Sequence, residues 1–257
     1  MKILFLYIWN FWCYSIMTII FIVSALIGLF LSLFSSTLFS LFTFFLARLI
    51  TFFLGVKTVV YGNYPINDND SYIYIANHSS YLDPVFTTYL IKKRHKYLGK
   101  AEILKWPIFG FVVKKYTIAV KRELKKSRSK SMDLMKKSLF SGFSIVLYPE
   151  GGWKDENQNH PYDIKPNEIL NQFRNGAFRL SIDSQKKIVP ISVSNAYEIH
   201  SSDSMMFKPG KVIINIHEPI DPVDYPLTEK GVRDLNEKCY SIIYNDLMKY
   251  DNRRKKI

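Results

Sequence analysis

The sequence predicts an α/β protein with a mixed, largely parallel sheet flanked by helices, preceded by an N-terminal membrane-anchoring helical segment. Residues 3–47 form an apolar block that contains no charged side chain. From Thr58 onward, short β-branched or aromatic runs alternate with stretches of helical periodicity, which is typical of an α/β domain. A chain of 257 residues suffices for one well-buried domain and an appendage. We therefore divide the chain into an anchor, 1–57, and a folded domain, 58–257.

The apolar block divides into two candidate helices, roughly 3–33 and 37–56, with Ser35 and Ser36 between them. Each provides the ~20 residues that a membrane-spanning helix needs. A cleaved signal peptide is the alternative, because Lys2 followed by an apolar run also begins such peptides. The block is longer than the apolar region of a signal peptide, and no small-residue cleavage site precedes a polar start. We therefore expect a membrane anchor.

The charges around the anchor predict its orientation. Lys2, Arg48 and Lys57 flank the apolar block, and the rest of the chain is rich in lysine and arginine. By the positive-inside rule, the folded domain lies on the cytoplasmic face of the membrane. A hairpin that crosses the bilayer and a helix pair that lies in one leaflet satisfy these charges equally well.

Short runs rich in β-branched or aromatic residues are the candidate strands. They lie at 58–61, 72–76, 97–99, 117–121, 144–148, 188–194 and 211–217. Apolar stripes at helical spacing predict amphipathic helices around 132–143 and 232–247. Pro190, inside a candidate strand, predicts an edge strand or a bulge. Gly176, inside a helical pattern, predicts a close backbone approach.

Composition narrows the class of partner. The chain has 35 basic and 22 acidic side chains, a net charge of +13 that favours an anionic partner. The basic runs 92–96 and 121–130 are solvated faces by default, and next to an anchor they would contact anionic membrane lipids at ~1 kcal/mol per side chain. Nucleic acid is disfavoured, because the aromatic residues do not alternate with the basic ones. Two cysteines, Cys13 and Cys239, are too few for a zinc cluster and fit a reducing compartment.

A histidine and an aspartate lie close together between a candidate strand and a probable helix. His78 and Asp83 are five residues apart across a short polar turn, so the carboxylate can reach an imidazole N–H and fix its tautomer. Such a pair is a general base for a hydroxyl group. The alternative is an ordinary loop histidine, with Asp83 as a helix N-cap in front of Pro84.

A second candidate segment follows the strand at 144–148. There Pro149, Glu150 and Gly151 form a turn with a carboxylate and glycine. Such a turn can simply end a strand, or it can expose backbone N–H groups to an anionic ligand or a developing oxyanion. Backbone donors near His78 are the other candidates for that oxyanion role.

Taken in order, these segments resemble the glycerolipid acyltransferase family, which includes the 1-acylglycerol-3-phosphate acyltransferases. The first family block, N-H-x-x-x-x-D, is matched by Asn77, His78 and Asp83. A second block ends in an arginine, here Arg122, although Tyr116 stands where a glycine often begins it. The resemblance covers roughly 57–220, and ordered blocks are more specific than any single motif.

The third and fourth family blocks complete the resemblance. Pro149-Glu150-Gly151 matches the third, and 189–191 matches the fourth. The chain departs from many relatives after Gly151, where Gly152 and Trp153 replace Thr-Arg. In the family, that arginine is implicated in binding the acceptor phosphate. Its replacement in this chain leaves the identity of the acceptor open.

The resemblance implies an acyltransferase of phospholipid synthesis. It would move a fatty-acyl group from acyl-CoA or acyl carrier protein to the sn-2 hydroxyl of 1-acylglycerol 3-phosphate, giving phosphatidic acid, with neither metal nor redox cofactor. His78 and Asp83 would be catalytic. The substrate would contact the remaining matched residues, Asn77, Arg122, Glu150 and Gly151. A different lysolipid or glycerol 3-phosphate as acceptor, and a catalytically silent lipid-binding module, remain the alternatives.

Overall fold

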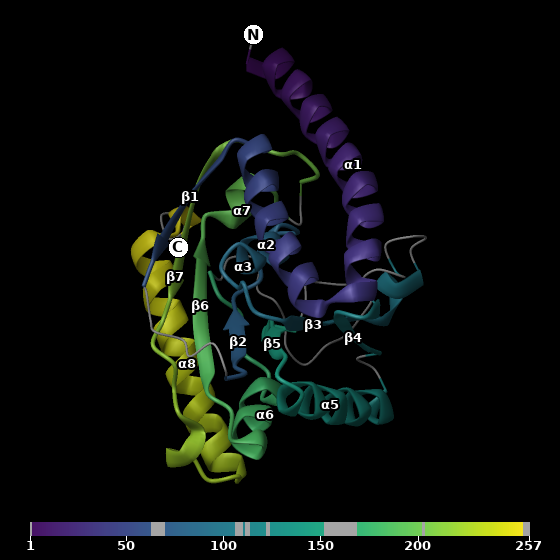
Figure 1. Cartoon of the computed structure of the whole chain (residues 1–257). Helices are drawn as coiled ribbons and strands as arrows, with labels where there is room; N and C mark the ends of the chain where they lie inside the picture. Colours follow the sequence, from purple (N-terminus) through teal and green to yellow (C-terminus); the bar gives the residue numbers. More distant parts are fainter. Residues whose placement is uncertain are drawn as a thin grey trace.

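A computed structural model describes residues 2–62, 70–105, 110, 114–121, 124–151, 169–201 and 204–253. Its centre is a seven-stranded sheet in the order β1-β7-β6-β2-β5-β3-β4 (Figure 1). The strands are β1 (Val56–Tyr61), β2 (Ile73–Ala76), β3 (His95–Lys100), β4 (Thr117–Val120), β5 (Ser144–Leu147), β6 (Ile188–Ser194) and β7 (Gly210–Ile216). All neighbours pair in parallel except β6 and β7. The predicted mixed, largely parallel sheet is confirmed, and each strand falls on a predicted run.

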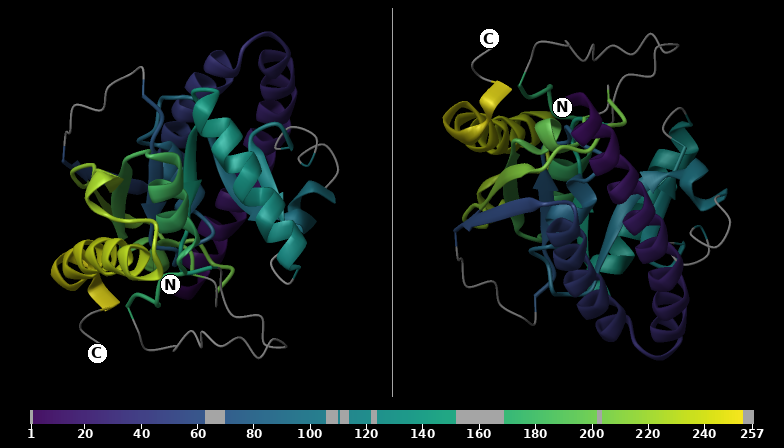
Figure 2. Two further views of the ribbon diagram at one scale, coloured as in Figure 1. Left: turned by 90° about the horizontal axis from the view of Figure 1, so that it is seen from below. Right: turned by 90° about the horizontal axis from the view of Figure 1, so that it is seen from above.

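Helices cover both faces of the sheet. They are α1 (Lys2–Phe34), α2 (Ser36–Phe53), α3 (Asp83–Thr88), α5 (Lys125–Phe140), α6 (Gly176–Ser184), α7 (Ala196–Ile199) and α8 (Glu229–Tyr250), with the short 3-10 helices η1 (Ala101–Lys105) and η2 (Pro222–Asp224). Figure 2 shows α1 and α2 on one side of the sheet and α8 on the other.

Side chains on the two faces of the central strands belong to two separate buried apolar clusters. Ile73 and Ile75 of β2 point into the cluster with α5, α6 and α8. Tyr74 and Ala76 point into the other cluster, with α1, α2 and α3. This alternation follows from the two-residue repeat of a strand, and burial on both faces explains why β2, β5 and β6 consist mainly of apolar residues.

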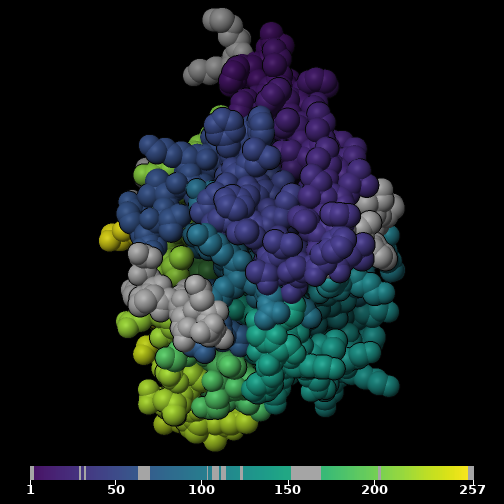
Figure 3. All heavy atoms as spheres, in the orientation of Figure 1, coloured from purple at the N-terminus to yellow at the C-terminus, as the bar shows by residue number. Residues whose placement is uncertain are grey.

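The first two helices form an antiparallel hairpin that packs on the folded domain. Ser35 ends α1 and caps α2, since its hydroxyl accepts hydrogen bonds from the backbone of Thr37 and Leu38. At the open end, the Trp12 indole donates to the Phe53 carbonyl at 3.3 Å. Space-filling atoms show the hairpin spread over the upper part of the molecule (Figure 3).

Most of the hairpin surface is apolar and exposed. Ile3–Gly28 and Ser36–Phe53 are long and apolar enough to cross a membrane, with mean hydropathies of 2.1 and 1.7, and only 22% and 28% of them is buried. Phe11 and Phe52 are 78% and 76% exposed. A soluble core helix would bury such side chains, so these helices suggest membrane association. Because α1 and α2 share a buried cluster with the sheet, the division of the chain at residue 57 stays a prediction.

Two local expectations are corrected or refined. Pro190 lies in β6, a central strand, so it does not mark an edge. It lies instead beside an irregularity in the pairing, because Ile191 pairs with Ile216 and Ile188 pairs with Ile220. Three residue steps along β6 are therefore opposite four steps along the partner segment. Gly176 was expected to mark a close backbone approach, but a Cβ added there would have open space around it.

Candidate active site

The turn between β2 and α3 brings His78 and Asp83 into contact. His78 Nδ1 lies 2.8 Å from Asp83 Oδ2. The Asp83 side chain is fully buried, whereas that of His78 is 18% exposed. With Nδ1 engaged by the carboxylate, Nε2 is the nitrogen that would accept a proton, so the pair has the geometry of an oriented general base.

The Asp83 carboxylate also organises the turn that carries the histidine. Its Oδ2 accepts the backbone N–H groups of Ser79 at 2.7 Å and Ser80 at 2.8 Å. Asp83 is the first residue of α3, and Leu82 occupies the N-cap position without a side-chain cap. The predicted N-cap role of Asp83 is therefore wrong, because its side chain turns back to the preceding loop.

Glu150 braces the histidine through the backbone. Its Oε1 accepts the His78 N–H at 2.6 Å, and its Oε2 accepts the backbone and side-chain N–H groups of Asn171 at 3.0 and 2.6 Å. Burial raises the pKa of the Glu150 carboxyl, an effect that these hydrogen bonds oppose. Both oxygens are engaged within the protein, which is the geometry of a positioning residue. Contact of Glu150 with substrate stays a prediction.

Asn77 joins the end of β2 to β6. Its side-chain amide donates to the Val193 carbonyl at 2.9 Å and accepts the Val193 N–H at 2.8 Å. The side chain is almost completely buried. Asn77 therefore fixes the backbone just before His78, and its contact with substrate also stays a prediction.

The face of the His78 ring is covered by Tyr148. The ring centroids are 4.2 Å apart and the planes differ by 20°. The Tyr148 hydroxyl is 2.9 Å from Thr87 Oγ1, and the Tyr97 hydroxyl is 2.8 Å from the same atom. Burial raises the pKa of Tyr97 to about 12 and that of Tyr148 well above its ordinary value, so both phenols stay protonated.

The backbone donors expected to meet an oxyanion already have protein acceptors. The N–H groups of His78, Ser79 and Ser80 donate to carboxylates, as described above. The Gly151 N–H donates to the Tyr148 carbonyl at 3.1 Å. These four groups are thus used for shaping the site, and an oxyanion would need another donor.

Gly151 is the glycine that a close approach requires. Its φ of +88° lies in the left-handed region, and an added Cβ would overlap the guanidinium of Arg174. Arg174 in turn donates its backbone N–H to the Pro149 carbonyl at 2.8 Å. A guanidinium therefore lies against the third block. The other predicted ligand, Arg122, and the departure at 152–153 lie outside the described residues.

Sequence reasoning missed the residues that act across strands. These are Tyr148 on the His78 ring, Thr87 and Tyr97 behind it, Asn171 on Glu150 and Arg174 on Gly151. Only Arg174 had a signal in the sequence, since it lies two residues before Gly176, which the helical pattern singled out.

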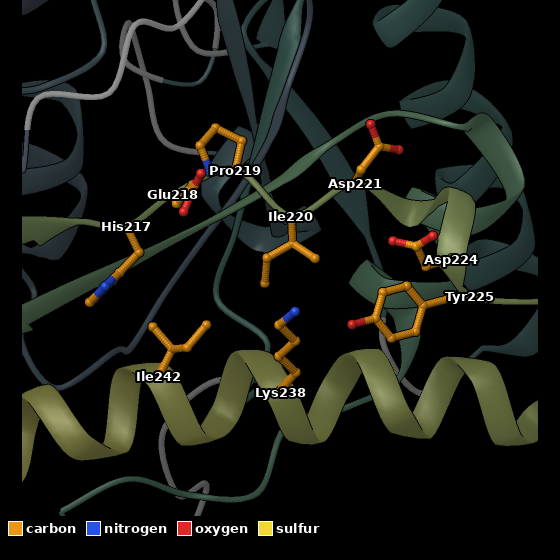
Figure 4. Close-up of a pocket in the computed structure, with 9 residues that line it drawn as sticks. All are labelled: His217, Glu218, Pro219, Ile220, Asp221, Asp224, Tyr225, Lys238 and Ile242. Carbon is orange, nitrogen blue, oxygen red and sulfur yellow. The ribbon is translucent and has the colours of Figure 1, made fainter.

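A separate surface pocket of about 350 Å³ lies between the segment after β7 and helix α8 (Figure 4). It is lined by His217, Glu218, Pro219, Ile220, Asp221, Asp224, Tyr225, Lys238 and Ile242. None of these residues belongs to the sequence blocks or touches the His78–Asp83 pair in the contacts described above. We therefore place the candidate active site at His78.

Comparison with known proteins identifies the family of this chain. A model of the acyltransferase family matches residues 57–194, more than half of the chain and the region that carries His78, Asp83 and Glu150. The chain belongs to the acyltransferase family.

The named relatives of this chain are distant in sequence. A 1-acyl-sn-glycerol-3-phosphate acyltransferase of Chlamydomonas reinhardtii is 24% identical over 152 residues, covering 58% of this chain and 42% of the relative. A human relative, 1-acyl-sn-glycerol-3-phosphate acyltransferase beta, is 24% identical over 170 residues, covering 65% of this chain and 56% of the relative. The chain thus spans about half the length of these relatives.

A solved structure shares the fold over nearly the whole chain. The 1-acyl-sn-glycerophosphate acyltransferase PlsC of Thermotoga maritima superimposes with a TM-score of 0.79 at 18% identity, covering 97% of each chain. The likeness includes the N-terminal helices as well as the sheet.

Proposed function

We propose that this acyltransferase moves a fatty-acyl group from acyl-CoA or acyl carrier protein to the sn-2 hydroxyl of 1-acylglycerol 3-phosphate, giving phosphatidic acid. The observation that carries the proposal is the His78 imidazole, oriented at 2.8 Å by the buried carboxylate of Asp83. The names of the sequence relatives support the choice of acceptor.

The proposed chemistry begins with the acceptor hydroxyl. His78 Nε2 takes its proton while the oxygen attacks the thioester carbonyl carbon, forming a tetrahedral intermediate. The C–S bond then breaks, and the leaving thiolate takes the proton back from the imidazolium. Asp83 holds the ring in one tautomer and stabilises its charged form throughout. The products are an ester and a free thiol.

The apolar hairpin would bring this site to its lipid substrate. We propose that α1 and α2 bind the membrane through their exposed aromatic and aliphatic side chains, with anionic lipids attracted by the net charge of +13. The folded domain would lie on the cytoplasmic face, as the flanking basic residues indicate. The docking of α1 on the domain, where Asn10 exchanges hydrogen bonds with the Phe207 backbone at 3.1 and 2.7 Å, favours helices lying along one leaflet over a spanning hairpin.

An acceptor panel tests the proposed function. Purified protein in detergent is supplied with one labelled acyl-CoA and with lysophosphatidic acid, a lysolipid carrying a larger headgroup, or glycerol 3-phosphate. We expect the label to enter phosphatidic acid, and His78→Ala to prevent it. Preferential labelling from another acceptor would assign that acceptor instead. If no acceptor is labelled, either with acyl-CoA or with acylated acyl carrier protein as the donor, the result would favour a silent lipid-binding module.

A further inference from the structure

The candidate base is one member of a short stack of aromatic rings. The His78 ring lies on Tyr148 at 4.2 Å between centroids, and Tyr148 lies nearly parallel to Tyr97 at 6.4 Å. His78 follows β2, Tyr148 follows β5, and Tyr97 belongs to β3, which are neighbours in the sheet. The stack therefore runs across the sheet, with the base at its open end.

We propose that Tyr148 is a positioning residue for His78, holding the imidazole in the plane in which Nδ1 meets Asp83 and stabilising the imidazolium formed during proton transfer. The inference rests on the proposed acyl transfer and adds to it a residue that exchanges no proton. The proton moves only from the acceptor hydroxyl to His78 and then to the leaving sulfur.

Geometry explains why the histidine needs this second restraint. A single hydrogen bond from Nδ1 to Asp83 fixes one edge of the ring but leaves the ring able to tilt about that bond. A stacked ring 20° from parallel removes the tilt. Nε2 is then held in one direction, as proton transfer to a bound substrate requires.

The Tyr148 ring is itself anchored to the helix that carries Asp83. Its hydroxyl bonds to Thr87 Oγ1 at 2.9 Å, and Thr87 is one turn after Asp83 in α3, with Oγ1 donating to the Asp83 carbonyl at 3.0 Å. The same short helix thus holds the carboxylate at the edge of the imidazole and the phenol against its face.

The charges around His78 make the effect of the ring separable. Asp83 faces it from the start of α3, and Glu150 accepts its N–H from the end of β5. Tyr148 covers one face, with Tyr97 behind it. An aromatic face typically favours an adjacent cation over its neutral form by a factor of roughly 2 to 30. Changing Tyr148 alone leaves both carboxylates in place.

The test compares Tyr148→Leu, which removes the aromatic face, with Tyr148→Phe, which keeps it. In Tyr148→Leu we expect kcat to fall at least roughly tenfold with little change in either KM. Tyr148→Phe should stay within about threefold of wild type. The control is Tyr74→Leu, a buried tyrosine of the same cluster that packs against Tyr72 at 6.1 Å.

A second readout does not depend on acyl transfer. In protein labelled at histidine, the His78 ring resonance is identified by its loss in His78→Gln. It should carry a ring-current shift in wild type and in Tyr148→Phe that disappears in Tyr148→Leu. Should Tyr148→Leu not fold, Tyr148→Met serves in its place. Equal kcat and an equal His78 resonance in the Leu and Phe variants, or an equal change in Tyr74→Leu, would overturn the proposal. If wild type shows the ring-current shift and Tyr148→Leu loses it, but wild type transfers no acyl group, the stacking stands and only the proposed function is refuted.

Discussion

The Asp83 carboxylate makes a sharp prediction, because one oxygen serves both the chemistry and the turn. Oδ2 receives His78 Nδ1 and the N–H groups of Ser79 and Ser80 within 2.8 Å. In Asp83→Asn, an amide oxygen at the position of Oδ2 can still accept the two backbone donors and the Nδ1–H group, but it carries no charge. The imidazolium that forms when His78 takes the hydroxyl proton then loses the carboxylate that stabilises it. His78 becomes a much poorer general base.

The size of each effect follows from these contacts. Loss of general-base help lowers the rate by about 10² to 10⁴. Hydrogen bonds to a charged acceptor are worth ~1.5–3 kcal/mol and neutral ones ~0.5–1.5 kcal/mol, so weakening two of them costs roughly 2 kcal/mol. For a chain of this size that is a fall in Tm of about 4–8 °C. Asp83→Ala should lose as much activity and more stability, because the N–H groups of Ser79 and Ser80 then lose their acceptor.

Activity and stability are measured separately. Acyl transfer is followed with a labelled donor in detergent, and Tm is read from the circular dichroism of the same samples. If Asp83→Asn keeps activity within about threefold of wild type, the charge of Asp83 is not needed to stabilise a protonated His78 and the general-base assignment fails. If Asp83→Ala is as stable as Asp83→Asn, the carboxylate does not hold the turn.

Three further outcomes follow from the structure. His78→Ala should abolish transfer while Tm changes by no more than about 2 °C and the protein stays on membranes, because the partly exposed ring contributes little to the core; residual activity near that of wild type would contradict its role. Replacing both Phe11 and Phe52, which are 78% and 76% exposed, by Glu should release the protein from membranes without lowering Tm, whereas Val223→Glu, 70% exposed but distant in the fold, should not; unchanged membrane recovery of the double variant would remove the anchor hypothesis. Burial raises the pKa of Glu150 above its ordinary 4.5, so its contribution to stability is fully present below that value and is lost as the pH rises through the folded-state pKa. Urea unfolding from pH 4 upward should therefore show wild type losing stability relative to Glu150→Gln, and parallel profiles would refute the shift.

Sequence patterns predicted the features that depend on residues close together in the chain. Strands appeared as β-branched runs because both faces of β2, β5 and β6 are buried, and the break at Ser35 was visible as a polar interruption of an apolar block. The pairing of His78 with Asp83 was also local, since five residues across one turn are enough to close a 2.8 Å contact.

Contacts that depend on the order of the strands in the sheet could not be predicted from the sequence. Asn77 meets Val193 across 116 residues, and Glu150 meets the His78 backbone across 72. No spacing rule links such positions, because they become neighbours only when β6 and β5 take their places beside β2. The same applies to Pro190, whose tolerance in a central strand depends on the irregular pairing with the segment after β7.

The docking of the hairpin has a consequence for how this chain is made. Asn10 bonds to the backbone of Phe207, which lies 197 residues later in the chain. Strand β1 pairs with β7, with Val56 opposite Gly210, so it also needs a late segment of the chain. At translation rates of ~5–20 residues per second, roughly 10 to 40 s pass between the synthesis of the two sides. During that interval the sheet cannot cover the inner face of the hairpin. The hydrocarbon region of a bilayer is an apolar phase that can hold α1 and α2 during this interval, so the membrane would act as a temporary folding partner of the chain.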